Sequence, residues 1–196
     1  MGRIILASRS PRRTSLLRLA GIPFEQIISD VPERNDLSLS PRGYVQELSR
    51  GKAEDVAQKV DEGLVIGADT VVSLKGTIME KPKDALEAAD MLSKLSGKWH
   101  SVFTGLTLID APRGRELSDV VATKVRMREV SPEEIRVYIA TDEPLDKAGA
   151  YAIQGRGAVF IEEIEGCFYN VVGLPLARLF AMMREMGYEP WAQTML

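Results

Sequence analysis

The sequence feature that most constrains the fold is an apolar run that leads directly into a helix start. Residues 3–8 read as a buried strand, and a Ser-Pro pair follows at residues 10–11. Ser is a favoured N-cap, and Pro suits the first helical position because its missing N–H would have no partner there. The same pair recurs at residues 40–41 and 131–132. Strands that turn into capped helices in this way predict an α/β or α+β chain with a mixed central sheet.

Apolar periodicity and turn signals predict the remaining elements. We expect helices over residues 41–60, 85–95, 132–141 and 174–186. We expect strands over residues 24–29, 64–68, 71–74, 77–80, 100–109, 117–130 and 158–165, and a loop over residues 169–175. No repeat or long linker interrupts this pattern. The expectation is therefore one domain over residues 1–196, with a division into two lobes near residue 76 or 120 as the alternative.

Composition narrows the class of protein. The chain has 196 residues, 45% hydrophobic and 27% charged, with a formal net charge of -3. These values are ordinary for a globular protein and give no sign of a general nucleic-acid or anionic-membrane binder. No apolar run resembles a signal peptide or approaches the roughly 20 residues of a membrane span. The single cysteine excludes an internal disulfide and fits a reducing compartment.

The first helix start is also a candidate anion site. Arg12 and Arg13 fall in its first turn, where the positive end of the helix dipole disfavours cations. Ser8 and Ser10 add hydroxyl groups beside the free backbone N–H groups of that turn. Phosphate is a common ligand of such a cluster. The alternative is an ordinary capped helix with solvated arginines.

Three further charged residues fall where strands end or loops begin. Glu33 follows the second predicted strand, and Lys81 precedes Pro82. Each is also explained as a turn or surface residue. Asp69 is different, because a carboxylate at the end of a strand that otherwise reads as core needs a metal, a lysine or a ligand as its partner. Since the chain has one histidine, a metal would have oxygen ligands, which favours Mg²⁺ or Mn²⁺.

The glycine-rich segment near residue 154 suggests a second kind of recognition. Gln154 and Arg156 alternate with Gly155 and Gly157, so the backbone can approach a ligand closely. A neutral amide has both donor and acceptor atoms and suits a base edge better than a phosphate. The alternative is a plain connection between two elements. Cys167 has no base near it in sequence, which argues against thiol catalysis.

Taken together, these segments resemble the Maf family of nucleotide pyrophosphatases. The resemblance is colinear and spans almost the whole chain. It rests on the blocks Ala7-Ser8-Arg9-Ser10-Pro11-Arg12-Arg13, Gly67-Ala68-Asp69-Thr70-Val71-Val72, Glu80-Lys81-Pro82, Leu95-Ser96-Gly97 with His100 and Thr104-Gly105, Asp146-Lys147-Ala148-Gly149-Ala150-Tyr151, Gln154-Gly155 and Gly173-Leu174-Pro175.

The resemblance implies an inosine-triphosphatase-like α/β fold with two lobes around a cleft. It implies hydrolysis of a nucleoside triphosphate between the α and β phosphates, a divalent metal, a cytoplasmic setting and often a homodimer. Asp69 takes the family role of general base. The family residues that line the site map onto Ser8, Arg12, Arg13, Glu33, Lys52 and Lys81.

These implied roles suggest a mechanism. Arg12, Arg13 and Lys81 would hold the phosphate chain. Glu33 and Asp69 would hold Mg²⁺ or Mn²⁺ and the attacking water, and Asp69 would take its proton. The two carboxylates would repel each other in an empty site, which predicts metal dependence.

Substrate choice follows from the late segment. The family branch that acts on dTTP and UTP carries Arg, Thr and Gln at the positions of Arg12, Thr70 and Gln154, whereas the branch that acts on 7-methyl-GTP differs over residues 151–155. We therefore expect a dTTP/UTP pyrophosphatase. The alternatives are a nucleotide-binding regulator of cell division, and a broad-specificity enzyme that removes modified nucleotides.

Overall fold

A computed structural model of the chain describes residues 2–32, 39–111 and 113–191. The chain divides into two compact units. Unit 1 comprises residues 1–69, 104–121 and 173–196, and unit 2 comprises residues 70–103 and 122–172. The chain thus crosses between units at residues 69/70, 103/104, 121/122 and 172/173. The third crossing is close to the expected division near residue 120, and the first comes earlier than the one near residue 76. The expectation of a single domain stays a prediction.

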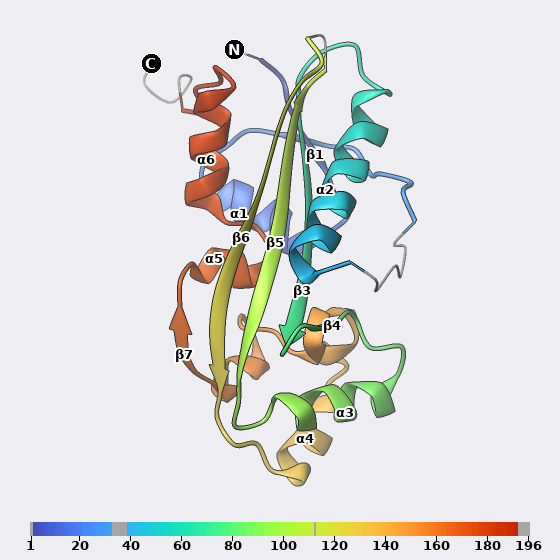
Figure 1. The fold of residues 1–196 in the computed structure, drawn as a ribbon, viewed down its shortest axis with the longest axis vertical. Coiled ribbons are helices and arrows are strands. Elements are labelled where there is room, and N and C mark those ends of the chain that lie inside the picture. The colour runs from blue at the N-terminus through green and yellow to red at the C-terminus, as the bar shows by residue number, and fades with distance from the viewer. Residues whose placement is uncertain (1, 33–38, 112, 192–196) are drawn as a thin grey trace. The chain divides into compact units, whose positions relative to one another are not determined.

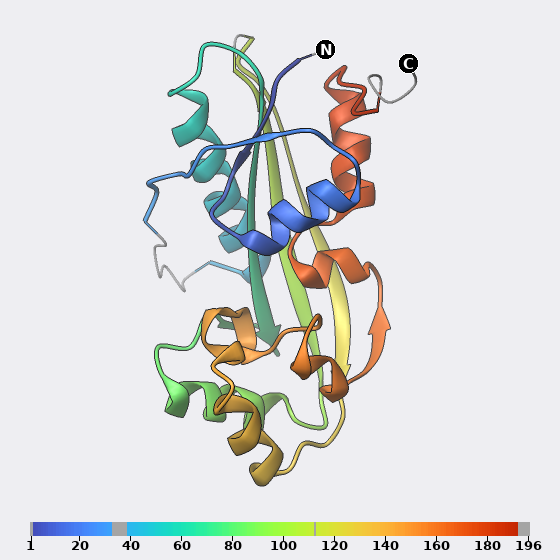
Figure 2. The ribbon, with the colours of Figure 1, turned by 180° about the vertical axis from the view of Figure 1, so that it is seen from behind.

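Unit 1 is built on a parallel arrangement of short strands. It contains β1 (Ile4–Ala7), α1 (Pro11–Leu19), β2 (Glu25–Gln26), α2 (Pro41–Ala57), α6 (Leu176–Glu185) and parts of β3 (Leu64–Leu74), β5 (Trp99–Asp110) and β6 (Arg115–Met127). Strand β1 pairs in parallel with β2 on one side and with β3 on the other. Figures 1 and 2 show α2 on one face of these strands and α1 on the other. The crossover from β1 through α1 to β2 and the one from β2 through α2 to β3 run in opposite directions across the sheet. Since such crossovers are right-handed, their helices lie on opposite faces.

Two glycines let helix α2 lie unusually close to the sheet. A Cβ added at Gly67 on β3 would stand 2.1 Å from the backbone oxygen of Ser49, and one at Gly105 on β5 would stand 2.2 Å from that of Val45. Both distances are far inside van der Waals contact, so only glycine permits this approach. The Ser49 hydroxyl is 3.0 Å from that of Thr107 across the same interface. The helix is therefore fixed against β3 and β5 at the level of Ser49.

Replacing the glycine on β3 tests this close approach. Gly67→Ala is expected to lose about 1–3 kcal/mol of unfolding free energy, because the new methyl group overlaps the α2 backbone. Gly43→Ala, in α2 itself, is the matched control. Its Cβ would lie 3.4 Å from the nearest atom, and alanine favours the helix by up to about 1 kcal/mol. Urea unfolding measures both variants, and equal stabilities would contradict the packing described here.

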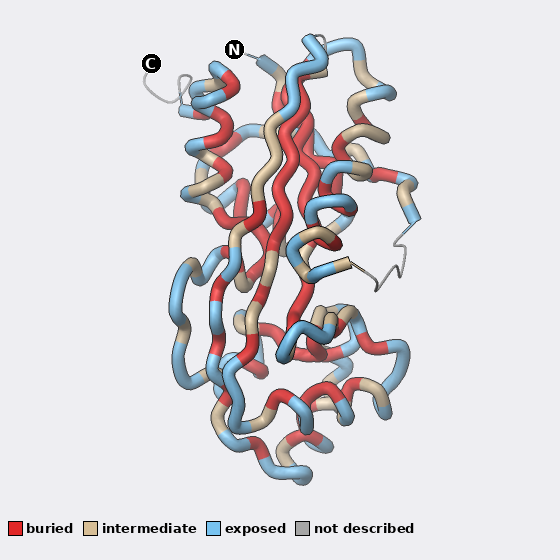
Figure 3. The backbone as a smooth tube through the Cα atoms, in the orientation of Figure 1, coloured by how far each residue is buried: buried red, intermediate tan, exposed pale blue. Residues whose placement is uncertain are grey.

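Unit 2 carries the remaining elements around its own core. They are β4 (Thr77–Met79), α3 (Ala85–Leu95), α4 (Pro132–Ile139), β7 (Ile161–Glu165), α5 (Phe168–Val172), the short 3-10 helices η1 (Glu143–Asp146), η2 (Ala148–Ala150) and η3 (Arg156–Phe160), and the other parts of β3, β5 and β6. Buried side chains of α3, α4 and the strands form one hydrophobic cluster, which includes Leu92, Tyr138 and Phe160. Figure 3 shows these buried positions alternating with exposed ones along α3 and α4.

The sheet confirms the predicted mixed α/β class. Its hydrogen-bonded strand order is β2-β1-β3-β5-β6-β7, with β4 paired to β3. The pairs of β1 are parallel, whereas β3 with β4 and β6 with β7 are antiparallel. Within residues 2–32, 39–111 and 113–191, no helix is long and apolar enough to cross a membrane.

The three Ser-Pro pairs start helices as predicted, but their side chains act differently. Ser40 accepts a hydrogen bond from the Gly43 N–H, and Ser131 forms a capping box with Glu134. Ser10 is the N-cap residue of α1, yet its side chain makes no capping hydrogen bond. Pro11 at the first position therefore favours the start of α1 without a capping hydrogen bond from the Ser10 side chain.

Five predicted elements need correction. The strands expected at 64–68 and 71–74 are one strand, so Asp69 lies inside β3 rather than at its end. The strand expected at 24–29 is only two residues long. Residues 156–160, read partly as strand, form η3, and the loop expected at 169–175 contains α5. Both helices are five residues long, which is too short to show an apolar period in the sequence.

Candidate active site

A buried arginine, Arg13, lies in the first turn of α1, just after the carboxyl end of β1 in unit 1. The Arg13 side chain is turned back from α1, and the residue is only 8% exposed. Its Nη1 donates to the Ser8 hydroxyl over 3.1 Å and its Nε to the Gly173 carbonyl over 2.9 Å. The Ser10 N–H also donates to the Ser8 hydroxyl, over 3.2 Å. Ser8 and Arg13 thus fix each other where β1 turns into α1, and the reading of Arg13 as a solvated surface residue is wrong.

The neighbouring strand carries a buried ion pair. The Lys52 Nζ of α2 lies 2.6 Å from the Asp69 Oδ1 of β3, and the two side chains are 12% and 11% exposed. The close packing of α2 at Gly67 puts Lys52 at this level. A metal, a lysine or a ligand was expected as the partner of Asp69, and the structure shows a lysine. A carboxylate held by one lysine inside a strand has a fixed direction, which suits a group that must meet a reactant.

Strand pairing brings these two groups to the same edge of unit 1. Ala7 of β1 pairs with Gly67 of β3, so Ser8 follows that pair by one residue and Asp69 follows it by two. In open α/β sheets, ligands bind outside the carboxyl ends of strands where the chain leaves in opposite directions. Arg12 lies half-buried in the first turn of α1 at this edge. Unit 1 thus gathers Ser8, Arg12, Arg13, Lys52 and Asp69 from the predicted set.

Unit 2 holds the other predicted residues that the structure describes. Thr70 is half-buried and follows Asp69 along β3. Lys81 is exposed and comes just after β4. The backbone next to Lys81 is fixed, because the Gly149 N–H donates to the Glu80 carbonyl over 3.0 Å.

Gln154 is exposed, but the backbone on both sides of it is held. The Glu143 carboxylate accepts hydrogen bonds from the N–H groups of Arg156 and Gly157, at 3.1 and 3.0 Å. On the other side, the Ala152 N–H donates to the Tyr138 hydroxyl over 3.1 Å. These contacts fix the segment in which the predicted base-reading amide lies.

A buried histidine, His100, contacts Tyr151, which lies three residues before Gln154. The His100 Nε2 lies 2.8 Å from the Tyr151 hydroxyl, and the rings meet edge to face with centroids 5.4 Å apart. Both residues are buried. Burial lowers the pKa of His100 to about 4 and raises the pKa of Tyr151 above its ordinary value. His100 is therefore a neutral core residue of unit 2 at neutral pH.

This burial predicts a pH-dependent stability. The folded imidazole stays neutral down to about pH 4, whereas the unfolded one takes up a proton near its ordinary pKa of 6.5. The unfolded chain thus binds the extra proton, and stability falls as pH is lowered from 6.5 towards 4. Wild type is expected to lose about 2–3 kcal/mol more than His100→Gln between pH 7 and pH 4.5. Urea unfolding at both pH values measures this difference, and identical pH dependence in the two proteins would contradict it.

The oxygen donors of unit 1 fit a metal bound together with a substrate. Across the described ranges, no group of three or more His, Cys, Asp or Glu side chains could hold a metal. Mg²⁺ is, however, commonly held by one or two carboxylates together with substrate phosphates. Asp69 provides one such carboxylate. Glu33, the second predicted ligand, lies outside the described residues.

Comparison with known proteins identifies the family. The sequence model of the Maf-like protein family matches residues 3–186. The chain belongs to this family, as the resemblance of its motifs indicated.

Similar proteins with curated descriptions agree over nearly the full length. A dTTP/UTP pyrophosphatase of Caldicellulosiruptor bescii is 52% identical over 193 residues, which is 96% of this chain and 97% of the relative. The dTTP/UTP pyrophosphatase of Carboxydothermus hydrogenoformans is 52% identical over 186 residues, covering 95% of this chain and all of the relative. That of Geotalea uraniireducens is 50% identical over 184 residues, covering 94% and 95%.

Sequence reasoning missed two residues that hold the late segment, Tyr138 and Glu143. They lie on α4 and at the start of η1, and they contact backbone N–H groups 13 and 14 residues further along the chain. Side chain to backbone contacts at such separations follow no periodic spacing. The one available signal was that a tyrosine on the buried face of a helix needs a partner for its hydroxyl.

Proposed function

We propose that this chain hydrolyses dTTP and UTP between the α and β phosphates, releasing the monophosphate and pyrophosphate. The observation that carries the proposal is the buried Lys52–Asp69 pair next to the Ser8–Arg13 cluster in unit 1. The pair holds the Asp69 carboxylate in one direction, and the cluster holds the Arg13 cation at the start of α1. The descriptions of the relatives as dTTP/UTP pyrophosphatases support the same reaction.

The cationic residues bind the phosphate chain. Arg12 and Arg13 stand in the first turn of α1, which contains no acidic residue. A bound phosphate would relieve the unfavourable meeting of these cations with the positive end of the helix dipole. Lys81, in unit 2, adds a positive charge for the phosphates.

Asp69 acts as the general base in this proposal. The attacking water gives its proton to the Asp69 carboxylate while its oxygen bonds to the α phosphorus. The bond between that phosphorus and the bridging oxygen breaks, and pyrophosphate leaves with the electron pair. Lys52 orients Asp69, since one carboxylate oxygen accepts its short hydrogen bond.

Asp69 and Glu33 are the residues that would hold the divalent cation, Mg²⁺ or Mn²⁺. When bound, such a cation neutralises charge on the phosphates. A cytoplasmic location and a homodimer, which the resemblance implied, stay predictions.

Gln154 selects the base in this proposal, together with Thr70 and Arg12. A thymine or uracil ring presents one imide N–H between two carbonyl oxygens. The amide of Gln154 has the acceptor and the donor that pair with this edge. Cytosine lacks the imide N–H, so the same amide discriminates against it.

The role of Asp69 predicts a large loss of activity without a loss of fold. Asp69→Asn keeps the size of the side chain but cannot take a proton, so pyrophosphate release from dTTP is expected to fall at least about a hundredfold. Asp90→Asn, which changes an exposed carboxylate paired with Lys94 on α3, is the matched control. Thermal unfolding confirms that both variants are folded. Near-normal turnover of a folded Asp69→Asn would overturn the assignment.

The role of Gln154 predicts a change in substrate choice. Gln154→Ala is expected to lower the ratio of kcat/KM for dTTP over CTP by about tenfold, the effect of one lost discriminating contact. Gln58→Ala, an exposed glutamine after α2, is the control. Steady-state kinetics on both substrates measure the ratio. An equal loss on dTTP and CTP would count against base reading.

A further inference from the structure

The segment around Gln154 is held by a single connected group of hydrogen bonds. The Tyr138 hydroxyl donates to the Glu143 Oε1 over 2.9 Å and accepts from the Ala152 N–H. Glu143 in turn accepts from the N–H groups of Arg156 and Gly157. One side-chain pair therefore binds the backbone two residues before Gln154 and two and three residues after it.

The Glu143 carboxylate is well suited to this contact. Burial alone would raise its pKa, but the hydrogen bonds from Gly157, Arg156 and Tyr138 outweigh this and lower the pKa of Glu143 below its ordinary value. The group is thus ionised at neutral pH and accepts strong, charge-assisted bonds. Gly155 has a φ of +130°, and a Cβ there would stand 2.7 Å from the Glu143 Oε2. Only glycine lets the carboxylate approach the segment this closely.

Tyr138 is fixed by its own surroundings. Its ring meets that of Phe160 edge to face, with centroids 5.0 Å apart, and burial raises the pKa of its hydroxyl above the ordinary value. The helix that carries it, α4, starts with the capping box of Ser131 and Glu134. Arg128 adds hydrogen bonds to Glu134 at 2.7 and 3.3 Å. The hydroxyl of Tyr138 is therefore a protonated, stationary group.

We propose that the Tyr138–Glu143 pair positions Gln154 for recognition of the pyrimidine base. This inference rests on the proposed function, in which Gln154 reads the base. An exposed amide on a free loop would have to be ordered at each binding event, and that entropy would reduce the discrimination it provides. Holding the backbone on both sides limits the positions that the amide can take before binding. Tyr138 and Glu143 are positioning residues and need not touch the substrate.

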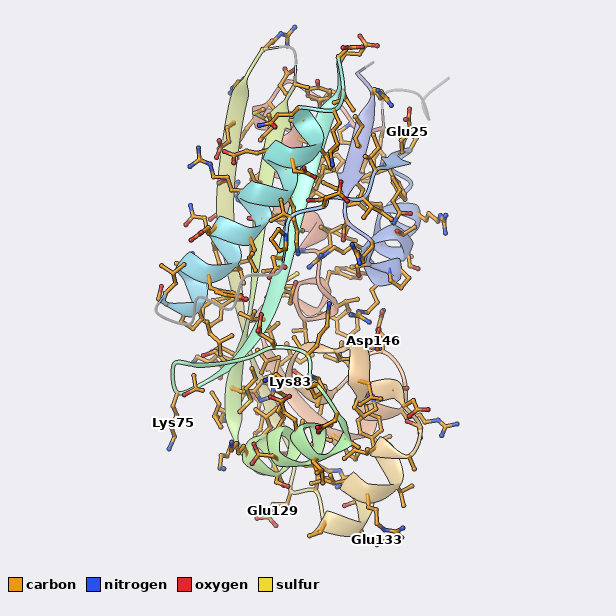
Figure 4. All side chains as sticks on the ribbon, turned by 90° about the vertical axis from the view of Figure 1, so that its right-hand side faces the viewer. Glu25, Lys75, Lys83, Glu129, Glu133 and Asp146 are labelled. Carbon is orange, nitrogen blue, oxygen red and sulfur yellow. The ribbon has the colours of Figure 1, made fainter. Side chains whose placement is uncertain are left out.

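Two conservative variants test the pair. Tyr138→Phe retains the ring against Phe160 and removes only the hydroxyl. Glu143→Gln retains the shape but places an NH₂ group where an oxygen accepts a backbone N–H. The matched control is Glu133→Gln on α4, labelled in Figure 4, whose exposed carboxylate pairs with Arg136. Gln154→Ala is the reference for lost base reading.

The decisive quantity is the ratio of kcat/KM for dTTP over CTP. Both variants are expected to lower it by about tenfold, as Gln154→Ala does, through a raised KM for dTTP. The values for CTP and the kcat for dTTP should change little, and Glu133→Gln should match wild type. Hydrogen exchange at the amides of Ala152, Arg156 and Gly157 should become faster in both variants.

The other outcomes distinguish a wrong positioning role for Tyr138 and Glu143 from a wrong base-reading role for Gln154. If Gln154→Ala lowers the ratio while Tyr138→Phe and Glu143→Gln retain it, the positioning role is wrong and the proposed function stands. An equal loss on all substrates that follows a fall in Tm would also overturn the role, because the pair would then be merely structural. If Gln154→Ala itself keeps the wild-type ratio, base reading by Gln154 is wrong and positioning for it is wrong with it. Should Glu143→Gln fail to fold, Tyr138→Phe alone decides.

Discussion

A carboxylate inside a buried strand is costly unless a counter-charge and hydrogen bonds accompany it. In unit 1 the Lys52–Asp69 pair meets this requirement, and much of the local sequence serves it. Gly67 and Gly105 let α2 lie against β3 and β5, and that approach sets the level at which Lys52 meets Asp69. Removing the Lys52 ammonium would take this counter-charge away from the Asp69 carboxylate. The pair therefore links the packing of the helix to the chemistry of the site.

The two units carry different parts of the proposed reaction. Unit 1 holds groups whose positions are fixed by burial, with Arg13 bonded to Ser8 and Gly173, and Asp69 bonded to Lys52. These suit charge stabilisation and proton transfer, which depend on preorganised groups. Unit 2 holds Gln154, an exposed side chain on a fixed backbone. Such a side chain suits recognition of a variable group, because it remains open to solvent until a ligand arrives.

Local signals in the sequence were enough to predict the elements that are stabilised by contacts close in sequence. The helix Ala85–Leu95 and the Ser-Pro helix starts follow from capping and periodicity alone. The sequence also indicated that Asp69 needs a partner, with a lysine among three alternatives. For Tyr138 it indicated only that a buried hydroxyl needs a partner, and for Glu143 it had no signal. The contacts of these two residues with residues 152–157 depend on how η1, α4 and η3 pack together. The burial of Arg13 was missed for the same reason, since Gly173 lies 160 residues away.

The most direct test is to measure the products released from a panel of nucleoside triphosphates in the presence of Mg²⁺ or Mn²⁺. The account predicts equal amounts of monophosphate and pyrophosphate, fastest from dTTP and UTP, and no reaction in a chelator. Release of diphosphate and inorganic phosphate would contradict cleavage between the α and β phosphates. Binding of the triphosphates without turnover of any of them would contradict the enzyme and favour a nucleotide-binding regulator.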